Sequence, residues 1–263
     1  MIPLCRRGRG FKDSSVKNQY FGDINDYLKY GLVRLLTGRS RLSTAVCWML
    51  TPDDGRSDGQ RISYLYYPLL WGHYDPELYN SLREIITHKN VRTVYQAENA
   101  GIVPGACCFA DYIPDDALQR AEYFKSFMNI SQCFDLIFFD PDNGIEVKSK
   151  PLGNKGSSKY LYWKEITASF FTGHSVLIYQ HFPRIQRDLF IERTALLLAK
   201  RTGVSAVYSF RTAYVVFFLA PWHNHDDYVA AAAASVESVW DRHFTTKKHV
   251  FNNNHFFSEE LYC

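Results

Sequence analysis

The stretch Phe134–Gly144 constrains the fold more than any other part of the chain. It reads FDLIFFDPDNG, a nearly continuous apolar and aromatic run that stops at Asp140. Such a run is typical of a strand buried on both faces of a parallel sheet. Pro141 withholds a backbone donor and Asn-Gly favours a turn, so the strand must end there. The stretch therefore predicts an α/β fold with a polar edge at the carboxyl end of this strand.

That polar edge is a candidate site, because ligands of open α/β sheets bind at the carboxyl ends of strands. Asp140 and Asp142 share one face if the chain stays extended, which suits metal binding or acid–base chemistry. Asn143 adds an amide, and His181 follows a later apolar run as a candidate general base. The alternative is structural: aspartate and asparagine are common turn residues, and His181 is then an ordinary loop residue.

Composition sets the class of protein. The chain has 263 residues, of which 46% are hydrophobic and 16% aromatic, so it can bury a sizeable core and is not a disordered chain. Its net charge of +3 permits a nucleic-acid partner without arguing for one. The apolar runs are too short to span a membrane, and the N-terminus lacks the apolar segment of a signal peptide. The cysteines form no CxxC pair and are expected to be reduced, so we expect a cytoplasmic protein without a membrane partner.

Strand-like and helical segments alternate along the chain. Residues 1–19 are polar and basic and are expected to be loosely ordered, whereas 20–263 show no linker or repeat and are expected to form one α/β domain. Asp23 is a candidate N-cap for the first helix, and Gly38 is expected to close it. The expected strands are 43–50, 91–97, 106–110, the stretch from Phe134, 175–179, 204–210 and 213–219, and the expected helices begin near residues 24, 75, 114, 162, 186 and 226.

The last two expected strands are separated only by Arg211-Thr212, a link too short for a crossover helix. They are therefore expected to form an antiparallel hairpin. The pattern as a whole predicts a Rossmann-like, mostly parallel seven-stranded sheet that ends in this hairpin, with helices on both faces. Gly31 lies inside the first helix, where glycine is unfavourable, and it is expected to mark close packing or a close approach of ligand.

Acidic residues recur after the expected strands. Asp53 and Asp54 follow the first, and Glu98, Asp111 and Asp140 follow later ones. The loop that contains Asp53 would repel a diphosphate, so a dinucleotide is disfavoured there. An acidic loop instead suits an uncharged ribose, a cationic group or a metal.

The order of elements and the terminal hairpin resemble the class I S-adenosylmethionine-dependent methyltransferase fold. The segment GDINDYLKYGLVRLL, residues 22–36, is similar to the opening helix of the 23S rRNA adenine-N6 methyltransferase J family, which has the pattern Gly-Asn-x-x-Asp-x-Leu-Lys-His. That family has Asp-Pro-Pro-Tyr where this chain has Asp140-Pro-Asp-Asn143. The resemblance implies S-adenosylmethionine as cofactor and implies these roles: Lys29 and Tyr30 beside the cofactor, Asp53 and Asp54 in its first loop, Glu98 on the ribose, Asp111 near the adenine and Asp140 as the catalytic residue that meets the acceptor.

The chain departs from that pattern at two positions. Tyr30 replaces the family's histidine, and Asn143 replaces the tyrosine that stacks on a flipped adenine. Specificity for adenine is therefore not implied, and a stacking side chain is expected elsewhere, with Tyr160, Tyr162 and Trp163 as candidates. GDINDYLKYGL, WMLTPDDG and FFDPDNG also resemble a bacterial family without an assigned activity.

Three functions follow from these residues. The first is an S-adenosylmethionine-dependent methyltransferase that acts on a nucleic acid or nucleotide. The second is a metal-dependent hydrolase of phosphoesters or nucleotides. The third is a catalytically inactive methyltransferase-like module that binds a ligand such as RNA. The hydrolase would use Asp53, Asp54, Asp58, Asp140 and Asp142.

Overall fold

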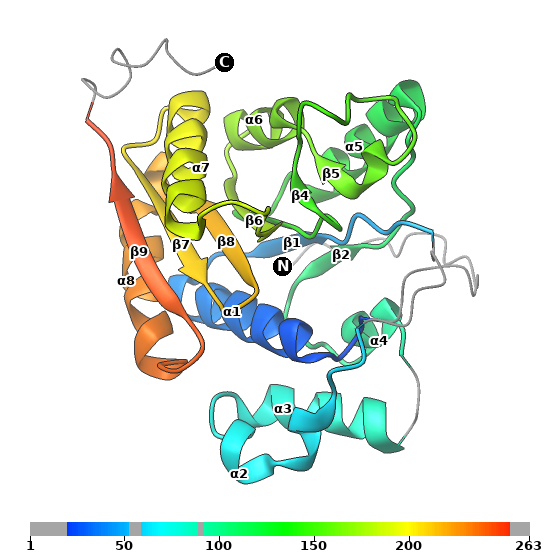
Figure 1. Ribbon diagram of the computed structural model, residues 1–263, viewed down its shortest axis with the longest axis vertical. Helices are drawn as coiled ribbons and strands as arrows, with labels where there is room; N and C mark the ends of the chain where they lie inside the picture. The colour runs from blue at the N-terminus through cyan, green and yellow to red at the C-terminus, as the bar shows by residue number, and fades with distance from the viewer. Residues whose placement is uncertain (1–19, 53–58, 89–91, 253–263) are drawn as a thin grey trace.

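In the computed structural model, which describes residues 20–52, 59–88 and 92–252, seven strands form one mixed sheet in the order β2-β1-β3-β6-β8-β7-β9 (Figure 1). Buried apolar side chains fill most of these strands, as the sequence predicts. The strands are β1 (Thr44–Cys47), β2 (Cys107–Phe109), β3 (Leu136–Phe139), β6 (Ser175–His181), β7 (Ala206–Arg211), β8 (Val215–Ala220) and β9 (Thr245–Val250).

The sheet has a parallel half and an antiparallel half. Strands β2, β1, β3 and β6 are parallel neighbours. Strand β8 is antiparallel to β6 and to β7, which confirms the predicted hairpin, and β9 is antiparallel to β7. Because β7 points the same way as β6, only β8 and β9 among these strands run in the opposite direction.

Helices cover both faces of this sheet, as predicted. One core packs under α1, α3 and α8, and the other under α5, α6 and α7. In Figure 1, α5, α6 and α7 occupy the upper part of the view, with α1 and α3 below them. The bounds are α1 Ile24–Ser40, α3 Pro76–Arg83, α5 Ala117–Ser131, α6 Trp163–Phe171, α7 Arg187–Thr202 and α8 Asp226–Val239. Shorter elements are η1 Ser63–Tyr66, α2 Pro68–Trp71, η2 Glu84–His88, α4 Val94–Asn99, β4 Gly144–Ile145, η3 Ser157–Lys159, β5 Tyr160–Leu161 and η4 His223–His225.

Helix α1 begins where the sequence predicts. Oδ1 of Asp23 accepts hydrogen bonds from the backbone N–H groups of Asn25 and Asp26 at 2.8 and 3.1 Å. The predicted stop at Gly38 is wrong, because the helix continues to Ser40 and ends at Arg41 in the left-handed conformation. An arginine with φ 60° is less favourable there than glycine, so local propensity did not decide this boundary.

Gly31 is explained by close packing of α1 on α8. A Cβ atom at this position would lie 2.1 Å from Cζ2 of Trp240, which directly follows α8 and is buried. The ring therefore occupies the space that any side chain at residue 31 would need.

The strands also differ from the predicted pattern at two places. Residues 94–97 of the strand predicted at 91–97 belong instead to the helix α4, in which only Ala97 is buried. Strand β9 was not among the expected strands, and its sequence TTKKHV buries only one side chain, His249. A polar edge strand carries no apolar run by which it could be recognised.

Three further observations concern the expectations from composition. Cys47, Cys108 and Cys133 are free thiols, but Cys107 is disulfide-bonded, which contradicts the expectation of reduced cysteines at that residue. None of the described helices is both long and apolar enough to cross a membrane. The segment 1–19 lies outside the described residues, so its predicted looseness stays a prediction.

Candidate functional site

A cavity of about 540 Å³ lies at the carboxyl ends of β1 and β3. Residues 48–51, which follow β1, and residues 140–143, which follow β3, form part of its wall. The chain leaves β1 toward β2 on one side and continues from β3 toward β6 on the other, so the strand order reverses between β1 and β3. This reversal is where ligands bind in open α/β sheets, and the volume is in the range of small-ligand sites.

The opening helix supplies another part of the wall. Asp26, Lys29 and Tyr30 from α1 line the cavity, as does the capping residue Asp23. Helix α1 precedes β1 and packs on one face of the sheet, and its first turns reach the strand ends, where they meet Asp140. Of these, Lys29 and Tyr30 were predicted, whereas Asp23 and Asp26 were recognised only as part of the helix motif.

Lys29 joins the two walls. Its Nζ lies 2.7 Å from Oδ1 of Asp26 and 2.7 Å from Oδ2 of Asp140. Only 9% of the Lys29 side chain and 15% of the Asp140 side chain are exposed, so water screens this pair weakly. Nζ also lies 5.3 to 5.7 Å from the ring centres of Tyr30, Trp48 and Tyr179, at cation–π distance.

The charges of this cluster shift one another's protonation. Burial raises the pKa of Asp140 to about 6, with Lys29 opposing the rise and Asp26 and Asp142 adding to it. Burial also raises the pKa of Asp23 to about 6, aided by the neighbouring Asp26. Burial lowers the pKa of Lys29, but Asp140 and Asp26 together outweigh it and hold that pKa well above its usual value. At neutral pH Lys29 is therefore an ammonium, and Asp23 and Asp140 are predominantly ionised.

The rest of the edge after Asp140 is also fixed by hydrogen bonds. Thr51 donates its hydroxyl to Oδ2 of Asp142 at 2.7 Å, which ties the end of β3 to the segment after β1. The backbone N–H of Asn143 donates to the carbonyl of Lys159 at 2.9 Å. Asp140, Asp142 and Asn143 all line the cavity, so the three predicted residues of this edge lie together.

Gln180 holds the turn that follows this edge, a role that the sequence did not suggest. Its Oε1 accepts from the N–H of Ile145 at 2.7 Å, and its Nε2 donates to the carbonyl of Asn143 at 3.3 Å. Gly144 has φ 108°, and a Cβ there would lie 2.3 Å from Oε1 of Gln180. The glycine after Asp-Pro-Asp-Asn was the signal for this close approach.

His181 ends β6 and lines the same cavity. Although the residue is exposed at the cavity, the surrounding protein desolvates the ring and lowers its pKa, with Lys29 adding to the effect and Asp142 opposing it. The imidazole is therefore neutral at neutral pH, the state that a general base requires.

The remaining predicted site residues lie elsewhere. Glu98 lies in helix α4 rather than after a strand, and it does not line the cavity. Asp111 follows β2, the strand beside β1, but it is exposed and also lies outside the cavity wall. Because 91–97 is not a strand, Asp111 takes the second strand end that was expected for Glu98. Asp53, Asp54 and Asp58 lie outside the described residues.

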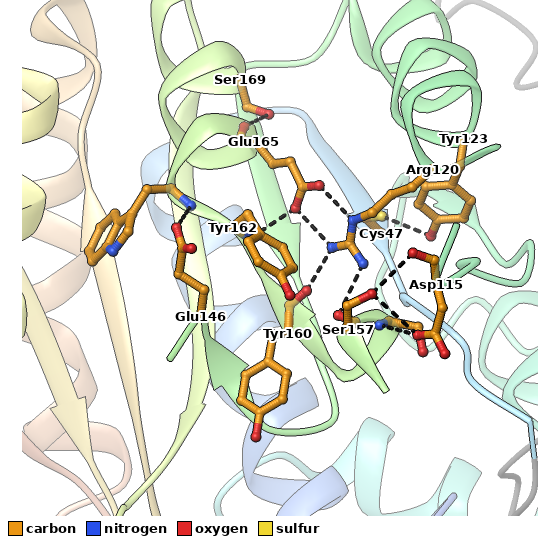
Figure 2. A network of polar contacts seen from close by, with 12 residues as sticks. Cys47, Asp115, Arg120, Tyr123, Glu146, Ser157, Tyr160, Tyr162, Glu165 and Ser169 are labelled. Carbon is orange, nitrogen blue, oxygen red and sulfur yellow. Dashed lines mark hydrogen bonds and ion pairs between the residues drawn. The ribbon is translucent and has the colours of Figure 1, made fainter. Parts of the chain in front are cut away.

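A buried ion pair braces the segment between β4 and α6 that lies beside the site (Figure 2). Nε and Nη2 of Arg120 lie 2.6 and 2.9 Å from the two carboxylate oxygens of Glu165, and Nη2 also donates to the carbonyl of Tyr160 at 2.6 Å. Asp115 accepts from the N–H groups of Gly156 and Ser158, both at 2.7 Å. This network fixes the loop from which Lys159 reaches the cavity wall.

The predicted stacking residues Tyr160, Tyr162 and Trp163 lie in the segment that this network braces. Tyr162 is buried and donates its hydroxyl to the carbonyl of Lys150, and Trp163 packs under Arg201. Neither of them, nor Tyr160, lines the cavity, so the expectation that these residues replace the missing tyrosine is not supported. The aromatic residues of the cavity wall are Tyr20, Phe21, Tyr30, Trp48 and Tyr179.

The wall thus combines carboxylates and aromatic rings with a few cations. This combination suits a ligand that carries a positive charge and an aromatic base, and it disfavours a diphosphate. In the part of the chain that the structure describes, no group of three histidine, cysteine or acidic residues is arranged to hold a metal ion. No protein-family model matches the sequence, and no curated protein matches it.

Proposed function

We propose that the chain is an S-adenosylmethionine-dependent methyltransferase of Rossmann-like fold that acts on a nucleic acid or nucleotide. The observation that carries this proposal is the position of the cavity at the reversal between β1 and β3, with the first turns of α1 in its wall. Going from β2 to β7, the order β2-β1-β3-β6-β8-β7 with only β8 reversed agrees with a methyltransferase sheet that lacks one edge strand.

The residues present fit this cofactor by their chemistry. The wall places the carboxylates of Asp23 and Asp26 and the rings of Trp48 and Tyr179 around the cavity, which suits a sulfonium, an ammonium group and an adenine ring. The wall also contains the cations Lys29, Arg61 and Lys159 for the carboxylate of the cofactor's methionine part. When bound, the cofactor supplies a methyl group on a positively charged sulfur.

Asp140 is the residue we assign to the acceptor. Lys29 holds one of its oxygens, which orients the carboxylate and keeps it ionised above a pH of about 6. A carboxylate in that state accepts a hydrogen bond from an amino or hydroxyl group of the acceptor. His181, neutral and on the same wall, is the candidate to take a proton from it.

Calorimetry with S-adenosylmethionine tests the proposal. A folded protein is expected to bind it with a Kd between about 1 µM and 1 mM, the range in which enzymes hold their substrates, and S-adenosylhomocysteine should compete. Absence of binding at about 1 mM ligand would remove the cofactor and with it the proposed reaction.

Two further measurements, thermal melting with metal ions and nucleic-acid binding, separate the two other functions. A hydrolase would show a melting shift with magnesium or manganese that Asp140→Asn abolishes, but among the described residues only Asp140 and Asp142 of its five predicted acids are in place. A binding module would bind nucleic acid with an affinity that is insensitive to Asp140→Ala.

A further inference from the structure

We propose that the surface around the β7–β8 turn binds a single-stranded nucleic acid alongside the cavity. This hairpin surface consists of Arg61, Phe182, Arg184, Arg187 and Tyr214. This inference rests on the proposed function, which supplies a nucleic acid as the acceptor. It adds the surface that would hold that acceptor. Nucleic-acid binding can be measured without cofactor, so the two proposals can fail separately.

One edge of the hairpin surface is part of the cavity wall. Arg61 lines the cavity, and its guanidinium carbon lies 4.3 Å from the ring centre of Tyr214. Tyr214 lies in the β7–β8 turn next to Ala213, whose carbonyl accepts a hydrogen bond from Nη1 of Arg187 at 2.9 Å. The contacts therefore run without a break from the cavity over the turn to the start of α7.

The other edge of the hairpin surface also lies next to the cavity. The guanidinium carbon of Arg187 lies 4.8 Å from the ring centre of Phe182, which directly follows the cavity residue His181. Arg211 lies 6.0 Å from the same ring and pairs with Asp188 at 2.6 Å. The hairpin surface therefore borders the cavity at Arg61 and again at Phe182. A nucleic-acid strand bound to this surface can place one nucleotide in the cavity, next to Asp140.

The charges of this surface are not compensated locally. Arg61, Arg184 and Arg187 are all exposed, and none of them forms an ion pair within the described part of the chain. Tyr214 is 54% exposed although Arg61 stacks on it. Exposed guanidinium groups without acidic partners match phosphates, which they bind in a bidentate manner.

The alternation of arginines and aromatic rings indicates which polyanion the surface binds. Aromatic rings and guanidinium planes are the platforms on which unstacked bases lie, and phosphates bind the neighbouring arginines. An anion without bases would use the arginines but would gain nothing from Tyr214 and Phe182. Paired bases would not reach the rings, so the ligand is single-stranded.

Fluorescence anisotropy with a labelled single strand of about ten nucleotides, without cofactor, tests this inference. Tyr214→Ala is expected to weaken binding about tenfold, whereas Tyr214→Phe keeps the stacking face and the affinity. Arg61→Ala and Arg187→Ala should each reduce the slope of log affinity against log salt by about 0.7.

Arg201→Ala is the matched control. Its guanidinium also lies 4.8 Å from an aromatic ring, that of Trp163, but it is at the opposite end of α7, about 20 Å from Arg187. Loss of affinity in Arg201→Ala equal to that in Arg187→Ala would overturn the proposal. An unchanged affinity in Tyr214→Ala, or displacement of the strand by polyphosphate at equal charge, would also overturn it, because the surface would then bind anions without reading bases.

Discussion

Nζ of Lys29 lies 2.7 Å from Oδ2 of Asp140, across 111 residues of sequence, and the same atom lies 2.7 Å from Oδ1 of Asp26. One buried ammonium thus connects the opening helix to the end of β3. Its charge balances carboxylates on both walls of the cavity, and it fixes the orientation of the aspartate that we assign to the acceptor.

Removal of this ammonium should destabilise the fold. Lys29→Met leaves Asp26 and Asp140 buried without a counter-charge, and the free energy of unfolding is expected to fall by about 3–5 kcal/mol. Urea denaturation of the wild type and the variant measures this difference in the free energy of unfolding. The double variant Lys29→Met, Asp140→Asn should recover part of the loss, because one uncompensated charge is gone. A loss in the single variant no larger than that of an exposed ion pair, about 1 kcal/mol, would contradict the account.

The raised pKa of Asp140 predicts how stability depends on pH. The folded state binds the proton more tightly than the unfolded state, in which the pKa has its usual 3.8, so this contribution is complete below about pH 4. This contribution is lost as the pH rises through about 6, and the free energy of unfolding falls by about 3 kcal/mol as a result.

Asp140→Asn should remove this loss, whereas Asp23, whose pKa is also raised to about 6, should still contribute one. Unfolding free energies of both proteins between about pH 4 and 7 provide the comparison. Parallel curves for wild type and Asp140→Asn would show that Asp140 does not titrate as described.

The turn after Asp140 should reject a side chain at Gly144. Gly144→Ala combines a positive φ with a clash against Gln180, and we expect a loss of stability of about 1–3 kcal/mol beyond the backbone strain. Gly173→Ala is the control, because Gly173 has φ 105° but no atom within 4 Å of the added Cβ. Thermal melting of the two variants should differ, and equal melting temperatures would show that Gln180 does not pack against the turn.

The contact between α1 and α8 can be tested with two glycines of one helix. Gly31→Ala drives a methyl group into Trp240 and should destabilise the protein by about 1–3 kcal/mol. Gly38→Ala meets no atom within 4 Å and should stabilise it, by up to about 1 kcal/mol, through helix propensity. Chemical denaturation separates the signs, and stabilisation by both substitutions would contradict the packing of α1 on Trp240.

The features that the sequence predicted depend on local chemistry. The cap at Asp23, the buried strand before Asp140 and the tight β7–β8 hairpin each follow from a few neighbouring residues. The edge of Asp140, Asp142 and Asn143 was recognisable for the same reason: an apolar run ends abruptly in polar residues.

The features that it did not predict depend on contacts between distant segments. Nothing near Gln180 indicates that its amide meets residues 143–145, and only the fold brings Asp26 and Lys29 to Asp140. The polar strand β9 pairs with β7 without an apolar pattern of its own. The segment 91–97 was predicted as a strand that ends before Glu98, and the role expected for Glu98 depended on that strand, which is the helix α4 from Val94 onward.

A crystal of the protein soaked with S-adenosylhomocysteine tests the central claim most directly. The account predicts the ligand in the cavity between the ends of β1 and β3, in contact with Trp48 and Lys29 and with its sulfur facing Asp140. An empty cavity at saturating ligand, or a ligand bound away from these residues, would contradict it.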